Sequence, residues 1–329
     1  MRLFYILLTI IFLQSCSFDN KSGIWKNENM PPEIDEKFDQ LESVVTVAPN
    51  FEKIIKVKED YKFRLSKKVL NKNWSDIYYN SSNNYKNFEY KNANEIFLKS
   101  RKISRKQLNK NILFENNYLI SSDNQGNIII FSINEKQVFR KINFYKKKYK
   151  KIKKILNIIV ENDTVYISDN LGYLYAYNYI DDKYIWAKNY KIPFRSNLKI
   201  YENKLIAVNQ NNNLFYFEKK TGEILKSIPT EETILKNNFI NNLSIHKKNT
   251  FFLNTYGSLY SISNDTLRIN WFVNLNDSII LGSNNLFQGN QIISDRNKIV
   301  VSSNNNTYVI DANSGLILSK KNLVQKLNH

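Results

Sequence analysis

A motif built around one glycine recurs along this chain and restricts the folds that the chain can adopt. Its clearest copy covers residues 168–177, with the glycine at Gly172 and with Trp186 fourteen residues after that glycine. A second copy has Gly257 and, at the same spacing, Trp271. Two matching copies so far apart indicate a repeat architecture, in which each copy is one structural unit.

Three further segments keep the same pattern but lack either the tryptophan or the glycine of the motif. One has Gly126, followed thirteen residues later by Phe139 where the clearest copies have tryptophan. The other two have asparagine at the turn, at Asn212 and near residue 305. Asparagine tolerates a positive φ better than other non-glycine residues, so these units are expected to keep the turn.

The residues around each turn predict strands. Each repeat begins with a strand and a tight turn, followed by a second strand rich in Tyr, Leu, Ile and Phe. A third strand then carries a large apolar residue. This order predicts one antiparallel sheet per repeat. The turns at residues 126, 172, 212, 257 and about 305 are 46, 40, 45 and about 48 residues apart, a period typical of β-propeller blades. Helical solenoids share this period, but the apolar residues here alternate with period two. The sequence therefore predicts an all-β fold, a β-propeller of four-stranded antiparallel blades.

The first residues predict a lipoprotein signal. Arg2 supplies a positive charge, and residues 3–13 form an apolar run that is too short to span a bilayer. Cys16 is the single cysteine of the chain and follows residues 13–15 (Leu-Gln-Ser), which resemble a bacterial lipobox. We predict a signal peptide over residues 1–15 and lipidation of Cys16. The alternative is an unmodified residue of the hydrophobic segment.

Composition divides the rest of the chain. Residues 16–70 are expected to form a lipid-anchored tether, polar up to the pair Pro31 and Pro32, and then N-terminal strands at 54–57 and 61–65. The propeller is expected over residues 71–329. It opens with an Asn-x-x-Trp segment that ends at Trp74 and leads into a loop.

Positive charge is unusually high. The chain has 48 Lys and Arg against 30 Asp and Glu, a net charge of +18. Such a balance ordinarily suggests nucleic-acid binding, but the lysines accompany an excess of Asn and Ile and no nucleic-acid motif. We predict no nucleic-acid partner. The one concentrated basic run, residues 145–154, is expected to be a solvated loop between blades, with an anionic-lipid or nucleic-acid patch as the alternative.

Catalytic chemistry has little support in the sequence. The two histidines, His246 and His329, are far apart, so neither a metal site nor a Ser-His-Asp or Cys-His centre is predicted. Phosphate-binding glycine loops are absent. We predict no catalytic residue, no metal and no cofactor. Trp186 and Trp271 are expected to pack one repeat against the next.

The lipobox, the tether, the Asn-x-x-Trp segment and the Gly-x-Leu-Tyr-Ala-Tyr repeats with their tryptophans resemble the propellers of the pyrroloquinoline-quinone (PQQ) type. Within these, residues 13–329 resemble the BamB family, lipoprotein scaffolds of outer-membrane β-barrel assembly. The resemblance implies an eight-bladed ring on the periplasmic face of the outer membrane, consistent with Ser17 after the cysteine. It also implies binding to a BamA-like subunit and to unfolded outer-membrane clients. Five repeats are visible, which predicts a smaller ring or, as we favour, an incomplete one.

The resemblance also suggests a partner-binding loop. The family carries two apolar residues, one apart, followed by arginine, and Ile192, Phe194 and Arg195 match that pattern around Pro193. Apolar side chains next to arginine are typical of interface hot spots. The alternative is that Ile192 and Phe194 belong to the core. An acidic pair of the family is not matched, because residues 238–242 read Asn-Phe-Ile-Asn-Asn.

Two alternative functions stay open. The first is a quinone-dependent dehydrogenase, since such enzymes use this type of propeller and hold cofactor and Ca²⁺ with a catalytic carboxylate on its axis. They commonly carry a vicinal cysteine pair, whereas this chain has one cysteine and is much shorter. The second is a scaffold for another cell-envelope complex.

Overall fold

The computed structural model describes residues 17–18, 25–26, 66–90, 96–233, 240–276, 286–303 and 306–322. The chain divides into two compact units, Met1–Arg64 and Leu65–His329. In the first unit β1 (Ser17–Phe18) pairs antiparallel with β2 (Trp25–Lys26). Cys16 and the predicted strands at 54–57 and 61–65 lie outside the described residues.

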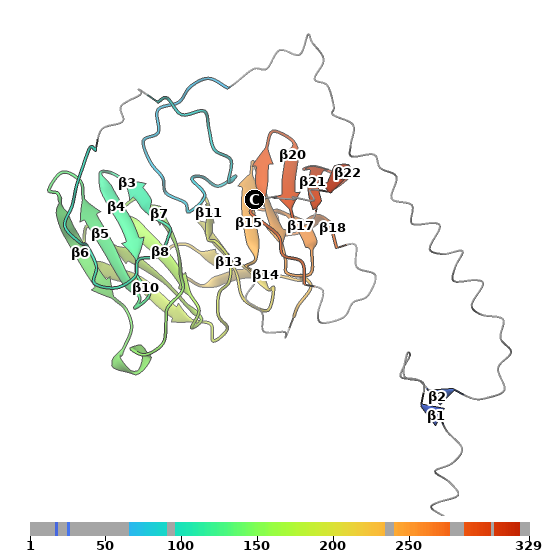
Figure 1. The fold of residues 1–329 in the computed structure, drawn as a ribbon, viewed down its shortest axis with the longest axis horizontal. Coiled ribbons are helices and arrows are strands. Elements are labelled where there is room, and N and C mark those ends of the chain that lie inside the picture. Colours follow the sequence, from blue (N-terminus) through green and yellow to red (C-terminus); the bar gives the residue numbers. More distant parts are fainter. Residues whose placement is uncertain are drawn as a thin grey trace, which may run out of the picture. The chain divides into compact units, whose positions relative to one another are not determined.

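The described residues of the second unit form five four-stranded antiparallel sheets, each built from consecutive strands, which confirms the all-β propeller architecture (Figure 1). The first three sheets are β3 (Leu113–Glu115), β4 (Tyr118–Ser122), β5 (Asn127–Ser132) and β6 (Gln137–Asn143); β7 (Leu156–Glu161), β8 (Thr164–Asp169), β9 (Tyr173–Asn178) and β10 (Lys183–Asn189); and β11 (Lys199–Tyr201), β12 (Lys204–Val208), β13 (Leu214–Glu218) and β14 (Ile224–Ile228). The last two are β15 (Asn242–His246), β16 (Asn249–Leu253), β17 (Ser258–Ser263) and β18 (Ile269–Asn274); and β19 (Ile293–Asp295), β20 (Lys298–Ser302), β21 (Asn306–Asp311) and β22 (Ile317–Asn322).

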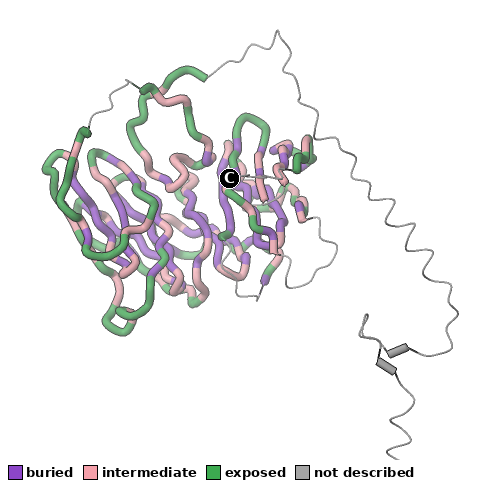
Figure 2. Tube along the Cα trace, viewed as in Figure 1, coloured by how far each residue is buried: buried purple, intermediate pink, exposed green. Residues whose placement is uncertain are grey.

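In every sheet the fourth strand is the most exposed (Figure 2). The middle strands are largely buried, while the fourth strands β6, β10, β14, β18 and β22 are mostly exposed. The first strands β7 and β15 carry buried residues along most of their length. The first strand is therefore the inner strand of each blade, and the fourth is the outer one.

The hydrophobic core lies between neighbouring blades. One cluster joins Ile120 of the first sheet to Ile167 of the second, and three others join the second to the third, the third to the fourth and the fourth to the fifth. Face-to-face burial of apolar side chains thus stabilises each pair of consecutive blades.

The turn residues behave as the repeat predicts. Gly126, Gly172 and Gly257 have φ of +84°, +85° and +86°, and Asn212 keeps the turn with φ of +66°. The fifth turn, near residue 305, lies outside the described residues. The side chain of Asn212 fits because its Oδ1 accepts a hydrogen bond from Thr255 Oγ1 at 3.1 Å.

An Asp or Asn three residues before each turn residue organises the turn. Its Oδ1 accepts two backbone N–H groups, from the second and fourth residues after it, at 2.8 to 3.1 Å. The four residues that do this are Asp123, Asp169, Asn209 and Asn254. Each side chain replaces the missing backbone partners of the turn, as in an Asx turn.

The two repeat tryptophans pack on the following blade, as predicted. Trp186 lies on Gly222 of the third blade and donates its indole N–H to the Lys219 carbonyl at 3.0 Å. Trp271 lies in the same way on Gly315 of the fifth blade. A Cβ at Gly222 would stand 2.6 Å from the Trp186 ring, so the ring requires a residue without a side chain there.

The expected equivalence of Phe139 with the tryptophans is wrong. The pairing of β5 with β6 skips Phe139 in a β-bulge, and Arg140 takes the position fourteen residues after the glycine. The Arg140 guanidinium reaches Asp182 of the next blade, with Nη1 and Oδ2 3.5 Å apart. An ion pair therefore joins the first blade to the second. At the equivalent position, a tryptophan packed on a glycine joins the second blade to the third and the fourth to the fifth.

We expect the substitution Gly222→Ala to destabilise the protein by roughly 1–3 kcal/mol, because the new methyl group overlaps the Trp186 ring. The positive φ of Gly222, +73°, adds backbone strain for alanine. A urea unfolding midpoint measures the change, with the exposed neighbour Lys220→Ala as control. An unchanged midpoint for Gly222→Ala would contradict the docking of Trp186.

Candidate functional site

A segment preceding the first blade runs along the inner strands. Between residues 74 and 82 its backbone carbonyls accept N–H groups from the first strands of four blades, at distances of 2.7 to 3.0 Å. The four bonds run from Phe114 to Trp74, from Val160 to Ser75, from Ile245 to Ser81 and from Ser294 to Ser82. We call residues 74–84 the inner segment.

The remaining blade holds the inner segment through a buried ion pair. Lys199, on β11, places its Nζ 2.7 Å from Asp76 Oδ2, 3.1 Å from the Asn80 carbonyl and 2.5 Å from Asn83 Oδ1. The Lys199 and Asp76 side chains are 0% and 3% exposed. Burial lowers the pKa of Lys199, and the carboxylate of Asp76 opposes that lowering. All three ammonium protons have an acceptor, as a buried cation requires.

Asn83 extends this contact to two more blades. Its Nδ2 donates to the Leu243 carbonyl of β15 and to the Ile292 carbonyl just before β19, each at 2.8 Å. Asn83 is itself fully buried. The inner segment therefore bonds to all five blades.

Phe194, one of the residues proposed to bind a partner, belongs to the core. Its side chain is 2% exposed and packs against Tyr190 and Phe217, with ring centroids 5.9 and 6.1 Å apart. Its backbone N–H donates to the Asp169 carbonyl at 2.9 Å. The core interpretation holds for Phe194, because the aromatic ring fills the space between the second and third blades and is not presented to a partner.

Ile192 and Arg195 lie on either side of this anchored residue and are half-buried. The backbone at Ile192 passes so close to Gly172 that a Cβ there would stand 3.0 Å from the Ile192 nitrogen. Arg195 donates its backbone N–H to Val208 and accepts one from Asn241, which fixes the loop to two blades. The loop of Ile192 and Arg195 is thus a rigid, partly exposed ridge.

The outer strands carry features that protect sheet edges. In every blade the pairing of the third strand with the fourth is interrupted by a β-bulge. The bulged residues are Phe139, Ile185, Leu225, Asn270 and Leu318. Bulges hinder the addition of another strand, so partner binding by strand addition is disfavoured along these edges.

The other predicted features divide into those inside and those outside the described residues. Cys16 is outside, as are residues 238 and 239 of the loop in which the family's acidic pair is unmatched. Across the described ranges, no three His, Cys, Asp or Glu side chains cluster as metal ligands. The part of the chain that the structure describes contains no apolar helix of membrane-spanning length.

Comparison with known proteins supports the fold. No protein-family model matches the sequence, and no curated protein sequence matches it. Among solved structures, the chain is similar to BamB from Moraxella catarrhalis, with a TM-score of 0.54 and 11% identity over 64% of this chain and 63% of that one. It is also similar to the quinohemoprotein alcohol dehydrogenase from Comamonas testosteroni, with a TM-score of 0.59 and 12% identity over 77% of this chain and 49% of that one.

A third similar structure is the computationally designed Ika8 protein, with a TM-score of 0.51 and 12% identity over 64% of this chain and 60% of that one. The chain thus spans between about half and two thirds of the length of these structures. This is a PQQ-like β-propeller fold. At such low identity the likeness concerns the fold alone.

We expect Asp76→Ala to destabilise the protein strongly, by about 3–5 kcal/mol, because it leaves the Lys199 ammonium buried without its counter-ion. Asp76→Asn should cost less, since the amide oxygen can still accept a hydrogen bond from Nζ. The control is Asp265→Ala, which breaks the exposed pair with Lys248 and should leave the urea midpoint nearly unchanged. Equal effects of Asp76→Ala and Asp265→Ala would contradict the role of the inner segment.

Proposed function

We propose that this protein is a non-enzymatic scaffold of the cell envelope that binds a BamA-like subunit and aids the insertion of outer-membrane proteins. The observation that carries the proposal is the inner segment. Its carbonyls and side chains bond to the inner strands of all five blades. Interaction with other molecules is therefore left to loops and outer surfaces, as suits a scaffold.

The residues of the inner segment do not fit a quinone and Ca²⁺. The one carboxylate of the inner segment, Asp76, is paired with Lys199 and also accepts the Tyr78 N–H at 2.9 Å. The two repeat tryptophans, Trp186 and Trp271, pack between blades and do not enclose a cofactor.

The ridge of Ile192 and Arg195 is the proposed contact surface for the partner subunit. Both side chains are partly exposed, and the buried ring of Phe194 between them holds the backbone in place. A preformed loop loses little conformational entropy when it binds. Phe194 would act as the anchor of the loop, with Ile192 and Arg195 making the contact.

A quinone-dependent dehydrogenase is the second candidate. The observation in its favour is the similarity to the quinohemoprotein alcohol dehydrogenase, which extends over 77% of this chain. A scaffold of another envelope complex is the third, because a rigid propeller with exposed loops suits many partners. Assay of quinone-dependent dehydrogenase activity with Ca²⁺ separates the second candidate from the other two.

Affinity capture from envelope membranes tests the partner. We expect a BamA-like protein to be recovered with the unaltered chain and to be lost with Ile192→Glu/Arg195→Glu, because two acidic groups would replace the apolar and cationic contacts. The matched control is Ile180→Glu/Arg268→Glu, which changes an exposed isoleucine and arginine elsewhere. Recovery of unrelated partners without a BamA-like protein would rule out the assembly role.

Membrane attachment is tested at Cys16. We expect the protein to carry acyl chains and to sediment with outer membranes, since two or more chains anchor a protein stably. Cys16→Ser should release it into the soluble envelope fraction, and globomycin should block processing of the unaltered chain. An unaltered chain whose processing is insensitive to globomycin would argue for an unmodified cysteine.

A further inference from the structure

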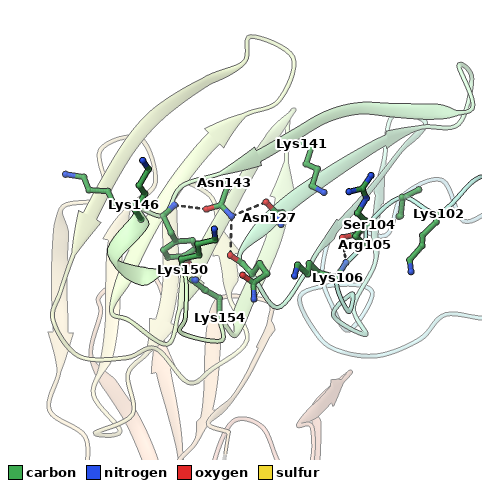
Figure 3. Close-up of a pocket in the computed structure, with 14 residues that line it drawn as sticks. Lys102, Ser104, Arg105, Lys106, Asn127, Lys141, Asn143, Lys146, Lys150 and Lys154 are labelled. Carbon is green, nitrogen blue, oxygen red and sulfur yellow. Dashed lines mark hydrogen bonds between the residues drawn. The ribbon is translucent and has the colours of Figure 1, made fainter.

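A strongly basic cavity lies beside the first blade. It has a volume of about 680 Å³ and lies between residues 102–106, the β4–β5 turn and the basic run at 145–154 (Figure 3). Eight of its fourteen lining residues are Lys or Arg, and none is Asp or Glu. This volume is typical of sites that hold small molecules.

One wall is tied to the first blade by a buried carboxylate. Asp123 Oδ2 accepts the Ser104 hydroxyl at 3.0 Å, while its Oδ1 accepts the N–H groups of Gln125 and Asn127. The Gln107 carbonyl accepts the N–H of Asn124 at 3.1 Å. These bonds hold Lys102, Arg105 and Lys106 at the edge of the cavity (Figure 3).

The opposite wall is held by Asn143 and Tyr145. Asn143 Nδ2 donates to the Gln125 carbonyl at 3.2 Å, and Asn143 Oδ1 accepts the Tyr145 N–H at 2.9 Å. The Tyr145 ring covers Gly126, where a Cβ would stand 2.3 Å from the ring. The lysines that follow, in and around the short 3-10 helix η1 (Lys147–Tyr149), therefore face residues 102–106 across the cavity.

Lys154 lines the cavity from below. The residue is 1% exposed, and its Nζ donates to the Tyr149 carbonyl at 2.5 Å and lies 5.2 Å from the centre of the Tyr145 ring. Burial lowers the pKa of Lys154, and the carboxylates of Asp123 and Asp169 oppose that lowering. The charge of this buried ammonium adds to the positive potential of the cavity, although the group itself is hardly exposed.

Overall composition does not account for this clustering. The chain contains 30 acidic residues, yet none lines the cavity. None of the ion pairs found among the described residues includes one of the eight cations. Cations gathered around one cavity repel each other, and a multivalent anion placed between them would relieve that repulsion.

We propose that this cavity binds a ligand that carries two or more phosphate groups. Lysine is a common point-charge partner of phosphate, and the amide groups of Gln125, Asn127 and Asn143 add neutral hydrogen-bonding groups. A single phosphate would reach one wall, whereas two or more bridge the lysines on both walls. The ligand is either a free polyphosphate or the phosphorylated headgroup of an anionic lipid.

Calorimetry with inorganic tripolyphosphate and flotation with vesicles test the two sources on the full chain at physiological salt. The vesicles contain cardiolipin, a lipid with two phosphate groups, in phosphatidylcholine, with pure phosphatidylcholine as reference. We expect Lys106→Glu/Lys150→Glu, one change on each wall, to weaken binding at least about tenfold. The matched control Lys220→Glu/Lys226→Glu makes the same charge change at two exposed lysines of the third blade and should retain binding.

A further variant separates binding in the cavity from general electrostatic attraction to the surface. Lys154 is almost inaccessible from the surface, and Lys154→Met removes its charge while keeping a similar apolar side chain. Weaker binding by this variant would support the cavity, and thermal unfolding checks that the variant folds. Equal weakening by the two double variants, or retained binding by a folded Lys154→Met, would assign binding to the net charge of +18 and overturn the proposal.

The probe that binds identifies the source. Tripolyphosphate binding without vesicle binding indicates a free polyphosphate, and vesicle binding that requires cardiolipin indicates a lipid headgroup. Tighter binding of a short single-stranded oligonucleotide than of either probe, lost in Lys106→Glu/Lys150→Glu, would indicate a nucleic-acid site and overturn the assignment.

Discussion

The buried contact of Lys199 with Asp76 and Asn83 is the interaction on which the arrangement of the blades depends. Removing an ammonium and a carboxylate from water costs several kcal/mol per ion, which is tolerated only where both groups are fully bonded. Here Nζ has three acceptors, and Asp76 also accepts a backbone N–H. Asp76 and Asn83 both belong to the inner segment. Their bonds to Lys199 therefore attach to β11 the same segment that bonds the other four inner strands.

A second set of contacts joins the blades near their outer strands. Trp186 on Gly222 and Trp271 on Gly315 join two pairs of blades, whereas Arg140 with Asp182 joins the first pair. A tryptophan contact needs glycine beneath the ring, because a Cβ there would overlap the ring. The arginine contact needs a carboxylate at the equivalent position of the next blade. The inner segment and these outer contacts together keep the loops rigid, which is the property that a scaffold needs.

Local constraints made the blades predictable from sequence. A positive φ restricts the turn to Gly or Asn, so the spacing of Gly126, Gly172, Asn212 and Gly257 reveals one sheet per repeat. The Asp or Asn three residues earlier was visible at the same spacing and was missed as part of the motif. Contacts distant in sequence were not predictable: Lys199 meets Asp76 across 123 residues, and Phe194 packs against Phe217 of the next blade. The basic run at 145–154 was evident in the sequence. Its position across a cavity from residues 102–106 was not, because only the fold brings the two segments together.

Hydrogen exchange of the unaltered protein tests most directly whether the inner segment unites the blades. The amides of Phe114, Val160, Ile245 and Ser294 lie in four blades, and each donates to a carbonyl of the inner segment. If the segment holds the blades as one cooperative unit, these amides should exchange with a common opening free energy and a common dependence on urea concentration. Separate opening free energies for each blade would contradict this, because each inner strand would then open without releasing the segment.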